Sequence, residues 1–235
     1  MNLILLFDSD FITEKQVRLT DRRLEHILTV HRAQEGDFLT VGQVNGLCGR
    51  GQLIRLNHQE AVLEVELSQQ PPAALPLTLI LALPRPRMLG RTLQHISTLG
   101  VKKLVLLHTK RVEKSYWMSP MLAEDKIQEQ LILGLEQAKD TLMPEVILEK
   151  QFKPFVEDRL PALCQGTLGL VAHPRVPDAC PRGIEQDTTL AIGPEGGFIP
   201  YEIEKLTEAG LKPVHMGERI MRVETAVTAL LARLF

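Results

Sequence analysis

Along residues 1–70, short apolar runs alternate with polar positions and are separated by turn residues. The runs "FLTVGQV", "RGQLIRL" and "AVLEVEL" have the period of two that is typical of strands with one buried face. In "DRRLEHILTVHRA", by contrast, Leu24, Ile27 and Leu28 recur at helical spacing. The pattern therefore predicts a small β-barrel or sheet with one short helix.

The pattern changes after "SQQPPAALP", where adjacent prolines fix φ and withhold amide donors. Beyond it, strand-length apolar runs alternate with helical patterns: "LTLILAL", "KKLVLLH", "EVILE", "TLGLVAH", "TTLAIG" and "KPVHM" are the runs. Helices are expected over about 88–99 and 123–139, near 155, from Pro200, and over "ETAVTALLARLF". This alternation predicts an α/β fold with a mostly parallel sheet covered on both faces, and two domains at residues 1–70 and 74–235.

The composition fits a globular chain of 235 residues, with 44% hydrophobic residues and a formal net charge of −2. The start, "MNLILLF", has no basic region before it and reaches Asp8 at once, so we expect no signal peptide. No apolar stretch approaches the roughly 20 residues of a membrane span. Cys48, Cys164 and Cys180 are odd in number and far apart, which favours reduced thiols in a cytoplasmic protein over disulfides or a zinc site.

Basic residues gather in one part of the chain despite the nearly balanced net charge. Between residues 71 and 120, Glu113 is the only acid. Such a segment is either a solvated face or a surface that neutralises nucleic-acid phosphates. The candidate RNA contacts are Arg85, Arg87, Arg91, Lys110, Arg111 and Lys114.

A glycine-rich turn, "IGPEGGF", joins an apolar run to a helix that is expected to start at Pro200. Its consecutive glycines, Gly196 and Gly197, let the backbone approach a ligand without a Cβ clash. The turn has neither the Lys-Ser/Thr of a P-loop nor the dinucleotide glycine spacing, and Glu195 would repel a phosphate. A neutral or cationic ligand suits it better, and S-adenosylmethionine, with its positive sulfonium, is such a molecule.

A second charged loop, "HMGERIMRVETA", leads from a predicted strand into the last helix. Glu224 and Thr225 fall at or near the start of that helix, where free amides favour an anion or a carboxylate. Ordinary helix capping is an alternative role for Glu224. Because ligands of parallel α/β sheets bind at the carboxyl ends of the strands, the two loops together indicate a site.

These two motifs resemble the hallmark motifs of the RsmE family, SPOUT-class enzymes that methylate a uridine N3 in 16S ribosomal RNA. The stretches "HILTVHRAQEGD", "LPR", "LGV" and "LEQAKDTLMPEV" extend the resemblance over nearly the whole chain. It implies a PUA-like N-terminal barrel, a C-terminal SPOUT-type α/β trefoil knot, bound S-adenosylmethionine, and a homodimer acting on ribosomal RNA or the small ribosomal subunit. Neither a membrane nor a metal is expected to take part.

The resemblance also implies a set of site residues. Arg222 would stabilise the anion that forms on the target base, and Glu224 would either orient Arg222 or accept the proton. The implied cofactor-binding residues are Leu170, His173, Ile192, Gly193, Pro194, Glu195, Gly196, Gly197, Met216, Gly217, Ile220, Met221, Arg222, Thr225 and Ala226.

The chain departs from the family pattern on the substrate side. "LGLEQAKD" keeps Glu136 and Gln137 but places Leu133 and Asp140 at positions where the family has an acidic residue and an arginine. Two alternatives therefore stay open: a SPOUT enzyme that methylates the ribose 2′-oxygen, and a noncatalytic RNA-binding paralogue.

Overall fold

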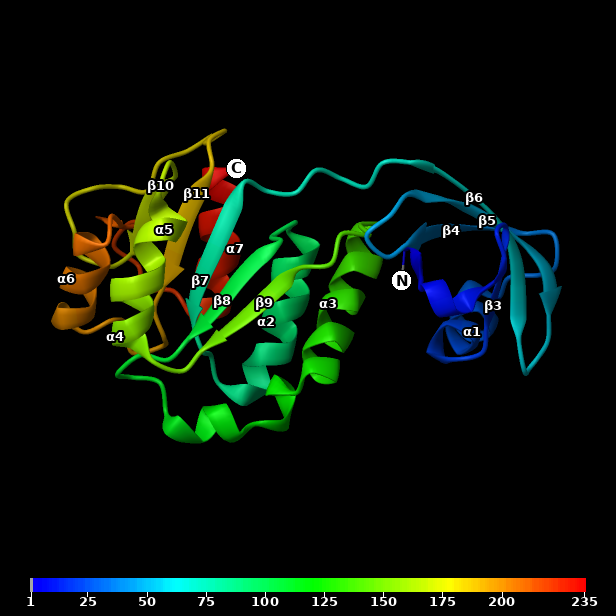
Figure 1. Ribbon diagram of the computed structural model, residues 1–235, viewed down its shortest axis with the longest axis horizontal. Helices are drawn as coiled ribbons and strands as arrows, with labels where there is room; N and C mark the ends of the chain where they lie inside the picture. The colour runs from blue at the N-terminus through cyan, green and yellow to red at the C-terminus, as the bar shows by residue number, and fades with distance from the viewer. Residues whose placement is uncertain (1) are drawn as a thin grey trace. The chain divides into compact units, whose positions relative to one another are not determined.

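The computed structural model describes residues 2–235, which form two compact units (Figure 1). The first unit contains the chain up to Ala73 together with Ile132–Met143. The second contains Ala74–Leu131 and Pro144–Phe235. The first crossing between the units lies inside the proline-rich segment of residues 68–76. No comparable proline-rich segment marks the return of residues 132–143 to the first unit.

The first unit is built on a six-stranded sheet in the order β1-β4-β5-β6-β3-β2. Only β1 and β4 pair in parallel, and the other neighbours are antiparallel. A short helix, α1 (Arg22–His26), covers the core together with a wide turn over Ile27–His31. The strands are β1 (Ile4–Leu6), β2 (Phe11–Thr13), β3 (Gln16–Leu19), β4 (Phe38–Gln43), β5 (Cys48–Leu56) and β6 (Ala61–Gln69).

The segment 132–143 completes the core of the first unit. Leu135 is fully buried against Leu3 and Cys48. Next to it, the buried Glu136 carboxylate accepts two hydrogen bonds from the Arg22 guanidinium, both at 3.0 Å. Burial raises the pKa of Glu136, and the charge of Arg22 opposes that rise. These contacts join residues 132–143 to the rest of the first unit.

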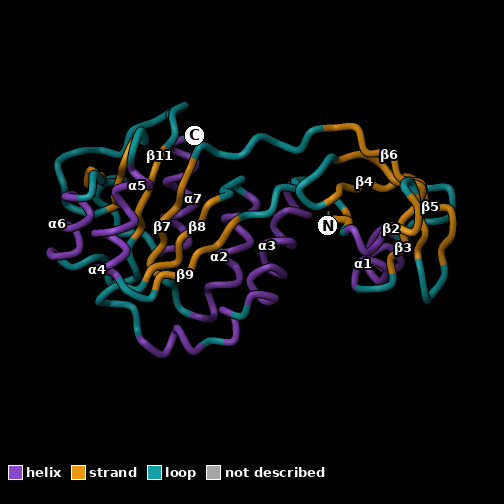
Figure 2. Tube along the Cα trace, viewed as in Figure 1, coloured by secondary structure: helices purple, strands orange, loops and turns teal. Residues whose placement is uncertain are grey.

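The second unit contains a six-stranded sheet in which every neighbouring pair is parallel. The order is β12-β10-β11-β7-β8-β9. Figure 2 draws the strands in orange, with β7, β8, β9 and β11 labelled. This confirms the predicted mostly parallel α/β sheet. The strands are β7 (Leu77–Ala82), β8 (Lys103–Leu107), β9 (Glu145–Glu149), β10 (Leu168–Ala172), β11 (Thr188–Ile192) and β12 (Lys212–Val214).

Helices lie on both faces of this sheet, as the apolar strand runs predict (Figure 1). On one face, Val171 and Ala191 pack against the helical segment around Phe155 and against Leu206. On the other, α7 packs against β11 and α2. The helices that belong wholly to this unit are α2 (Pro86–Thr98), α4 (Phe152–Pro154), α5 (Leu160–Cys164), α6 (Pro200–Glu208) and α7 (Val223–Leu234). Helix α3 (Glu124–Ala138) begins in the second unit and ends in the first.

Within residues 2–235, no helix has both the length and the apolar character that crossing a membrane requires.

Candidate functional site

A cavity of about 230 Å³ opens at the carboxyl ends of the three neighbouring strands β10, β11 and β12. Ligand pockets usually measure roughly 300 to 1,000 Å³, so this one is small. Its position is the one where parallel α/β sheets bind ligands. The lining residues are Ala172, His173, Pro174, Ile192, Gly193, Pro194, Glu195, Gly196, Gly197, Val214, His215, Met216, Gly217, Arg219, Ile220, Met221, Val223, Ala226 and Leu230.

The glycine turn after β11 forms one wall of this cavity and leaves backbone donors available. Gly197 has a φ of 73°, and its N–H donates to the carbonyl of Pro194 at 2.7 Å. Within residues 2–235, the amides of Glu195 and Gly196 have no hydrogen-bond acceptor. Unpaired amides beside a cavity are ready to bind an acceptor group of a ligand.

Gly193 is required by the close approach of the chain to itself. A Cβ at this position would lie 3.0 Å from Cδ2 of Phe198 and 3.1 Å from its backbone nitrogen. Phe198 is buried, so neither atom has room to move. The turn therefore folds tightly over Phe198, and its other side is left to the cavity.

Two histidines line the cavity beside the glycine turn. Nδ1 of His173 is buried and has no hydrogen-bond partner within residues 2–235. Burial lowers the pKa of His173, which keeps the ring neutral at neutral pH. Nδ1 of His215 accepts the N–H of Gly217 at 2.9 Å. A buried polar atom without a partner is costly unless a ligand or water satisfies it, so His173 marks a polar contact point.

The loop between β12 and α7 forms the second wall. Gly217 has a φ of 103°, which allows the sharp turn after His215. Ile220 is 75% exposed although it also lines the cavity. An apolar side chain so exposed at a cavity rim offers surface to a ligand or to another molecule.

Arg222 and Thr225 do not line the cavity, although the resemblance assigns both to the cofactor. Arg222 is the N-cap residue of α7 and is exposed, and Thr225 is exposed in the first turn of the helix. Within residues 2–235, the Arg222 side chain makes no hydrogen bond or ion pair. Glu224 is half-buried in the first turn of α7. Arg222 thus stands at the edge of the cavity with a free guanidinium.

Two residues of the basic segment contact the glycine turn. The Arg111 guanidinium donates to the carbonyl of Gly196 through Nη1. Nε of Arg85 lies 3.7 Å from Oε1 of Glu195, and the Arg85 backbone N–H is 3.4 Å from the same oxygen. These two predicted RNA contacts therefore reach the loop that carries the unpaired amides.

The other predicted RNA contacts are all exposed to solvent. Arg87 and Arg91 lie on α2, and Lys110 and Lys114 follow β8. Side chains that hold phosphates must be accessible in this way, but a solvated face has the same appearance.

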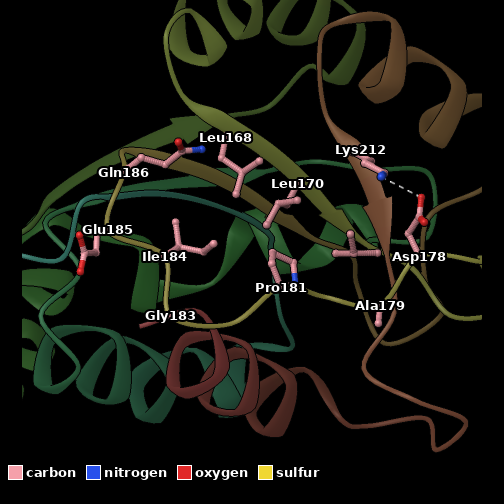
Figure 3. Close-up of a pocket in the computed structure, with 11 residues that line it drawn as sticks. Leu168, Leu170, Asp178, Ala179, Pro181, Gly183, Ile184, Glu185, Gln186 and Lys212 are labelled. Atoms are coloured by element: carbon pink, nitrogen blue, oxygen red, sulfur yellow. Dashed lines mark ion pairs between the residues drawn. The ribbon is translucent and has the colours of Figure 1, made fainter.

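A second, larger cavity of about 680 Å³ is lined by residues of β10, β12 and the segment 178–186 (Figure 3). Leu168 and Leu170 project from β10 toward Ile184 and Pro181, and an ion pair of 3.0 Å joins Lys212 to Asp178. This cavity contains neither the glycine turn nor the second loop. The structure places Leu170 on its wall and away from the smaller cavity, since Leu170 lies two residues before the carboxyl end of its strand.

The two departures from the family pattern, Leu133 and Asp140, belong to the first unit. Asp140 is buried, and its Oδ1 accepts the N–H of Leu142 at 2.9 Å. Its position is thus a structural turn, and it takes no part in the cavity after β11. No cluster of three or more metal-binding side chains occurs within residues 2–235.

Several cavity residues are missing from the set that the sequence predicts. His215 and Arg219 lie inside the quoted motif "HMGERIMR" and could have been included by extending the assignment through it. Val223 and Leu230 are apolar residues of the last helix, and their helical spacing indicates burial without saying that one edge faces a ligand.

Comparison with known proteins defines the class of the fold and of this site. A family model described as an RNA methyltransferase domain matches residues 71–235, which is more than half of the chain. The matched region contains both loops of the cavity.

Relatives that match over most of their length identify the family within this class. The chain is 30% identical over 236 residues to ribosomal RNA small subunit methyltransferase E of Treponema pallidum, covering 97% of this chain and 89% of that protein. It is 30% identical over 231 residues to the Synechocystis protein of the same name, covering 95% and 74%. The chain therefore belongs to the ribosomal RNA small subunit methyltransferase E family, the RsmE family of RNA methyltransferases.

The fold is also that of a solved structure. The crystal structure of ribosomal RNA small subunit methyltransferase E from Neisseria gonorrhoeae, bound to S-adenosyl methionine, superposes with a TM-score of 0.76 at 24% identity. The match covers 99% of this chain and 95% of that one. Both units of the chain are thus represented in that fold.

Proposed function

We propose that this protein transfers a methyl group from S-adenosylmethionine to N3 of a uridine in the RNA of the small ribosomal subunit. The observation that carries the proposal concerns two neighbouring backbone amides, those of Glu195 and Gly196. Within residues 2–235 they have no hydrogen-bond acceptor, and both residues line a cavity at the ends of three parallel strands. Family membership supplies the reaction class.

The residues present fit S-adenosylmethionine. The Glu195 and Gly196 amides and the orphaned Nδ1 of His173 supply polar contacts of the kind that a nucleoside needs. Apolar side chains such as Ile192 and Leu230 line the rest of the cavity. When bound, S-adenosylmethionine supplies an electrophilic methyl group.

The protein's own contribution begins with the acidity of the target. N3 of uracil carries a proton that must leave before the nitrogen can accept a methyl group, and the negative charge then spreads to the flanking carbonyl oxygens. A fixed cation near those oxygens stabilises the anion and lowers the barrier. Arg222 is suited to this role because its guanidinium has no partner in the described part of the chain and stands at the start of α7, where the helix dipole adds positive potential.

Glu224 is the companion of Arg222 in this proposal. It lies two residues further along, in the first turn of α7, and is half-buried. From there it either orients Arg222 or accepts the N3 proton. Both roles need a carboxylate at this position.

The RNA has to present an unpaired uridine, because N3 is otherwise engaged in base pairing. The exposed cations Arg87, Arg91, Lys110 and Lys114 would hold its backbone. We further propose that the first unit is a PUA-like RNA-binding domain and that the second is a SPOUT knot. The active form would be a homodimer that works on ribosomal particles in the cytoplasm.

Labelled cofactor tests the proposal directly. Small ribosomal subunits that lack the modification are incubated with the protein and methyl-labelled S-adenosylmethionine, and the labelled nucleotide is mapped by nuclease digestion and mass spectrometry. We expect one labelled uridine with the methyl group on N3. Label on a ribose would favour the 2′-O reaction instead. No label, with no cofactor binding in calorimetry, would identify a noncatalytic RNA-binding protein.

A further inference from the structure

The peptide unit between Gly196 and Gly197 is held at both ends. Its carbonyl accepts a hydrogen bond from Arg111, and its N–H donates to the carbonyl of Pro194. Since a peptide unit is planar, fixing both groups fixes the orientation of the whole plane. The two free amides, of Glu195 and Gly196, immediately precede this plane and are positioned by it.

The aliphatic stem of Arg111 also packs directly against the turn. A Cβ at Gly196 would lie 2.9 Å from Cδ of Arg111, 3.5 Å from its Cβ and 3.7 Å from its Cγ. Gly196 does not have a positive φ, so the backbone alone would accept another residue. The need for glycine here comes from the closeness of Arg111.

Neighbouring groups reinforce the same connection. Arg85 pairs with Glu195 from the loop after β7. The buried Glu202 carboxylate accepts the Lys110 N–H at 2.7 Å and the Ile199 N–H at 2.9 Å, which ties the loop after β8 to the start of α6. The turn after β11 is thus braced from the loops of two adjacent strands.

We propose that Arg111 is a positioning residue for the cofactor-binding turn and that it is not an RNA contact. It fixes the Gly196 carbonyl and thereby presents the Glu195 and Gly196 amides to the cavity. This inference rests on the proposed function, because it assigns a role toward the same cofactor. All six basic residues are exposed, and the inference divides them by contact: Arg85 and Arg111 contact the turn, and the other four are left for phosphates.

The test compares two arginines of the same segment. Arg87 is exposed and has no hydrogen-bond or ion-pair partner within residues 2–235, so Arg87→Ala is the matched control for Arg111→Ala. Cofactor affinity is measured by calorimetry with S-adenosylmethionine alone, and RNA affinity by titration of small ribosomal subunits at several salt concentrations. Thermal unfolding of each variant verifies that it is folded.

The two variants should give opposite results. Arg111→Ala should raise the Kd for S-adenosylmethionine about fivefold to tenfold, as expected for loss of one charge-assisted hydrogen bond, and leave the salt dependence of RNA binding unchanged. Arg87→Ala should leave the cofactor Kd within about twofold and reduce the slope of log K against log salt by about one. Arg111→Lys should restore most of the cofactor affinity, because a single donor is enough for the Gly196 carbonyl.

A double-mutant cycle with Gly196→Ala gives a second, independent readout. The added Cβ should weaken cofactor binding by displacing the Arg111 stem, and it should do so much less in the Arg111→Ala background. Additive effects would overturn the proposal. It would also be overturned if Arg111→Ala kept the wild-type cofactor Kd and lowered the salt slope. If the wild-type protein bound no S-adenosylmethionine, the proposed function itself would fail.

Discussion

The two loops that enclose the cavity are built differently. The turn after β11 is held by Arg85, by Arg111 and by the buried carboxylate of Glu202. The loop between β12 and α7 starts with two backbone hydrogen bonds of His215, to Asp178 and Cys180. Its residues 217–220 are exposed, and among them, within residues 2–235, only the Gly217 N–H is hydrogen-bonded, to Nδ1 of His215. One wall is fixed before any ligand arrives, whereas the other presents its side chains to solvent.

This difference suggests a division of labour between recognition and chemistry. Backbone amides discriminate between ligands only if their directions are set in advance, and the braced turn meets that requirement. Arg222, at the end of the open loop, has no hydrogen-bond or ion-pair partner among residues 2–235 that it would have to leave when a charged substrate approaches. Substitutions in each wall can test whether the two walls differ in this way.

The largest effect on stability is expected at Glu202, whose carboxylate ties the loop after β8 to the start of α6. Glu202→Ala leaves the N–H groups of Lys110 and Ile199 without their buried acceptor and should lower the free energy of unfolding by about 3 kcal/mol. Urea denaturation measures the change. Glu218→Ala, an exposed position in the open loop, is the control and should shift stability by less than about 0.5 kcal/mol. Equal losses in both variants would remove the distinction between the walls.

Arg222→Ala should act on chemistry alone. We expect kcat to fall about 100-fold, equivalent to about 2.7 kcal/mol of transition-state stabilisation, while the Kd for S-adenosylmethionine stays within about twofold. Single-turnover methylation and calorimetry give the two quantities separately. A parallel loss of both would make Arg222 a cofactor-binding residue and the open loop part of the cofactor site.

Alanine substitution of one glycine in each wall should give a graded result. At Gly193, the new Cβ meets the buried Phe198, including its backbone nitrogen, so the free energy of unfolding should fall by about 2 kcal/mol. At Gly217, no atom of residues 2–235 lies within 4 Å of a new Cβ, and only the φ of 103° is strained, at a cost of about 1 kcal/mol. Urea denaturation measures the loss of unfolding free energy in both variants. A larger loss at Gly217 than at Gly193 would contradict the comparison.

The smallest effect concerns pH. Burial lowers the pKa of His173 in the folded protein, so below its usual value of about 6.5 the unfolded chain takes up this proton first. His173 therefore destabilises the fold as the pH falls from about 6.5 toward its folded pKa, and adds no such penalty above that range. His173→Gln should show a shallower loss of stability between pH 7 and 5 than the wild type. An unchanged slope would mean that His173 is solvated.

The sequence predicts the parallel sheet well because its strands are buried on both faces and appear as nearly unbroken apolar runs. It also places both cavity loops, since glycines and a helix start mark them locally. The roles of Arg85 and Arg111 could not be read in the same way. Their partners lie 110 and 85 residues away, and neither periodicity nor local charge reports such a contact.

Burial of charged groups limits the prediction further. Glu202 looks like an ordinary acidic residue in a first helical turn, and only the fold reveals that both of its oxygens are occupied. Asp140 resembles a change in the substrate site, yet it is a buried turn residue of the first unit. The sequence alone does not distinguish a carboxylate that accepts backbone N–H groups from one that contacts a substrate.

Helix α3 has a practical consequence for dissecting the molecule. Its first turns belong to one unit and its last turns to the other, so the polypeptide crosses between the units three times in all. A fragment cut at residue 74 would carry Leu135 into water and leave the Glu136 carboxylate without Arg22. A fragment made by a single cleavage at residue 74 should therefore be prone to aggregation. The two units should be expressed and purified as one chain.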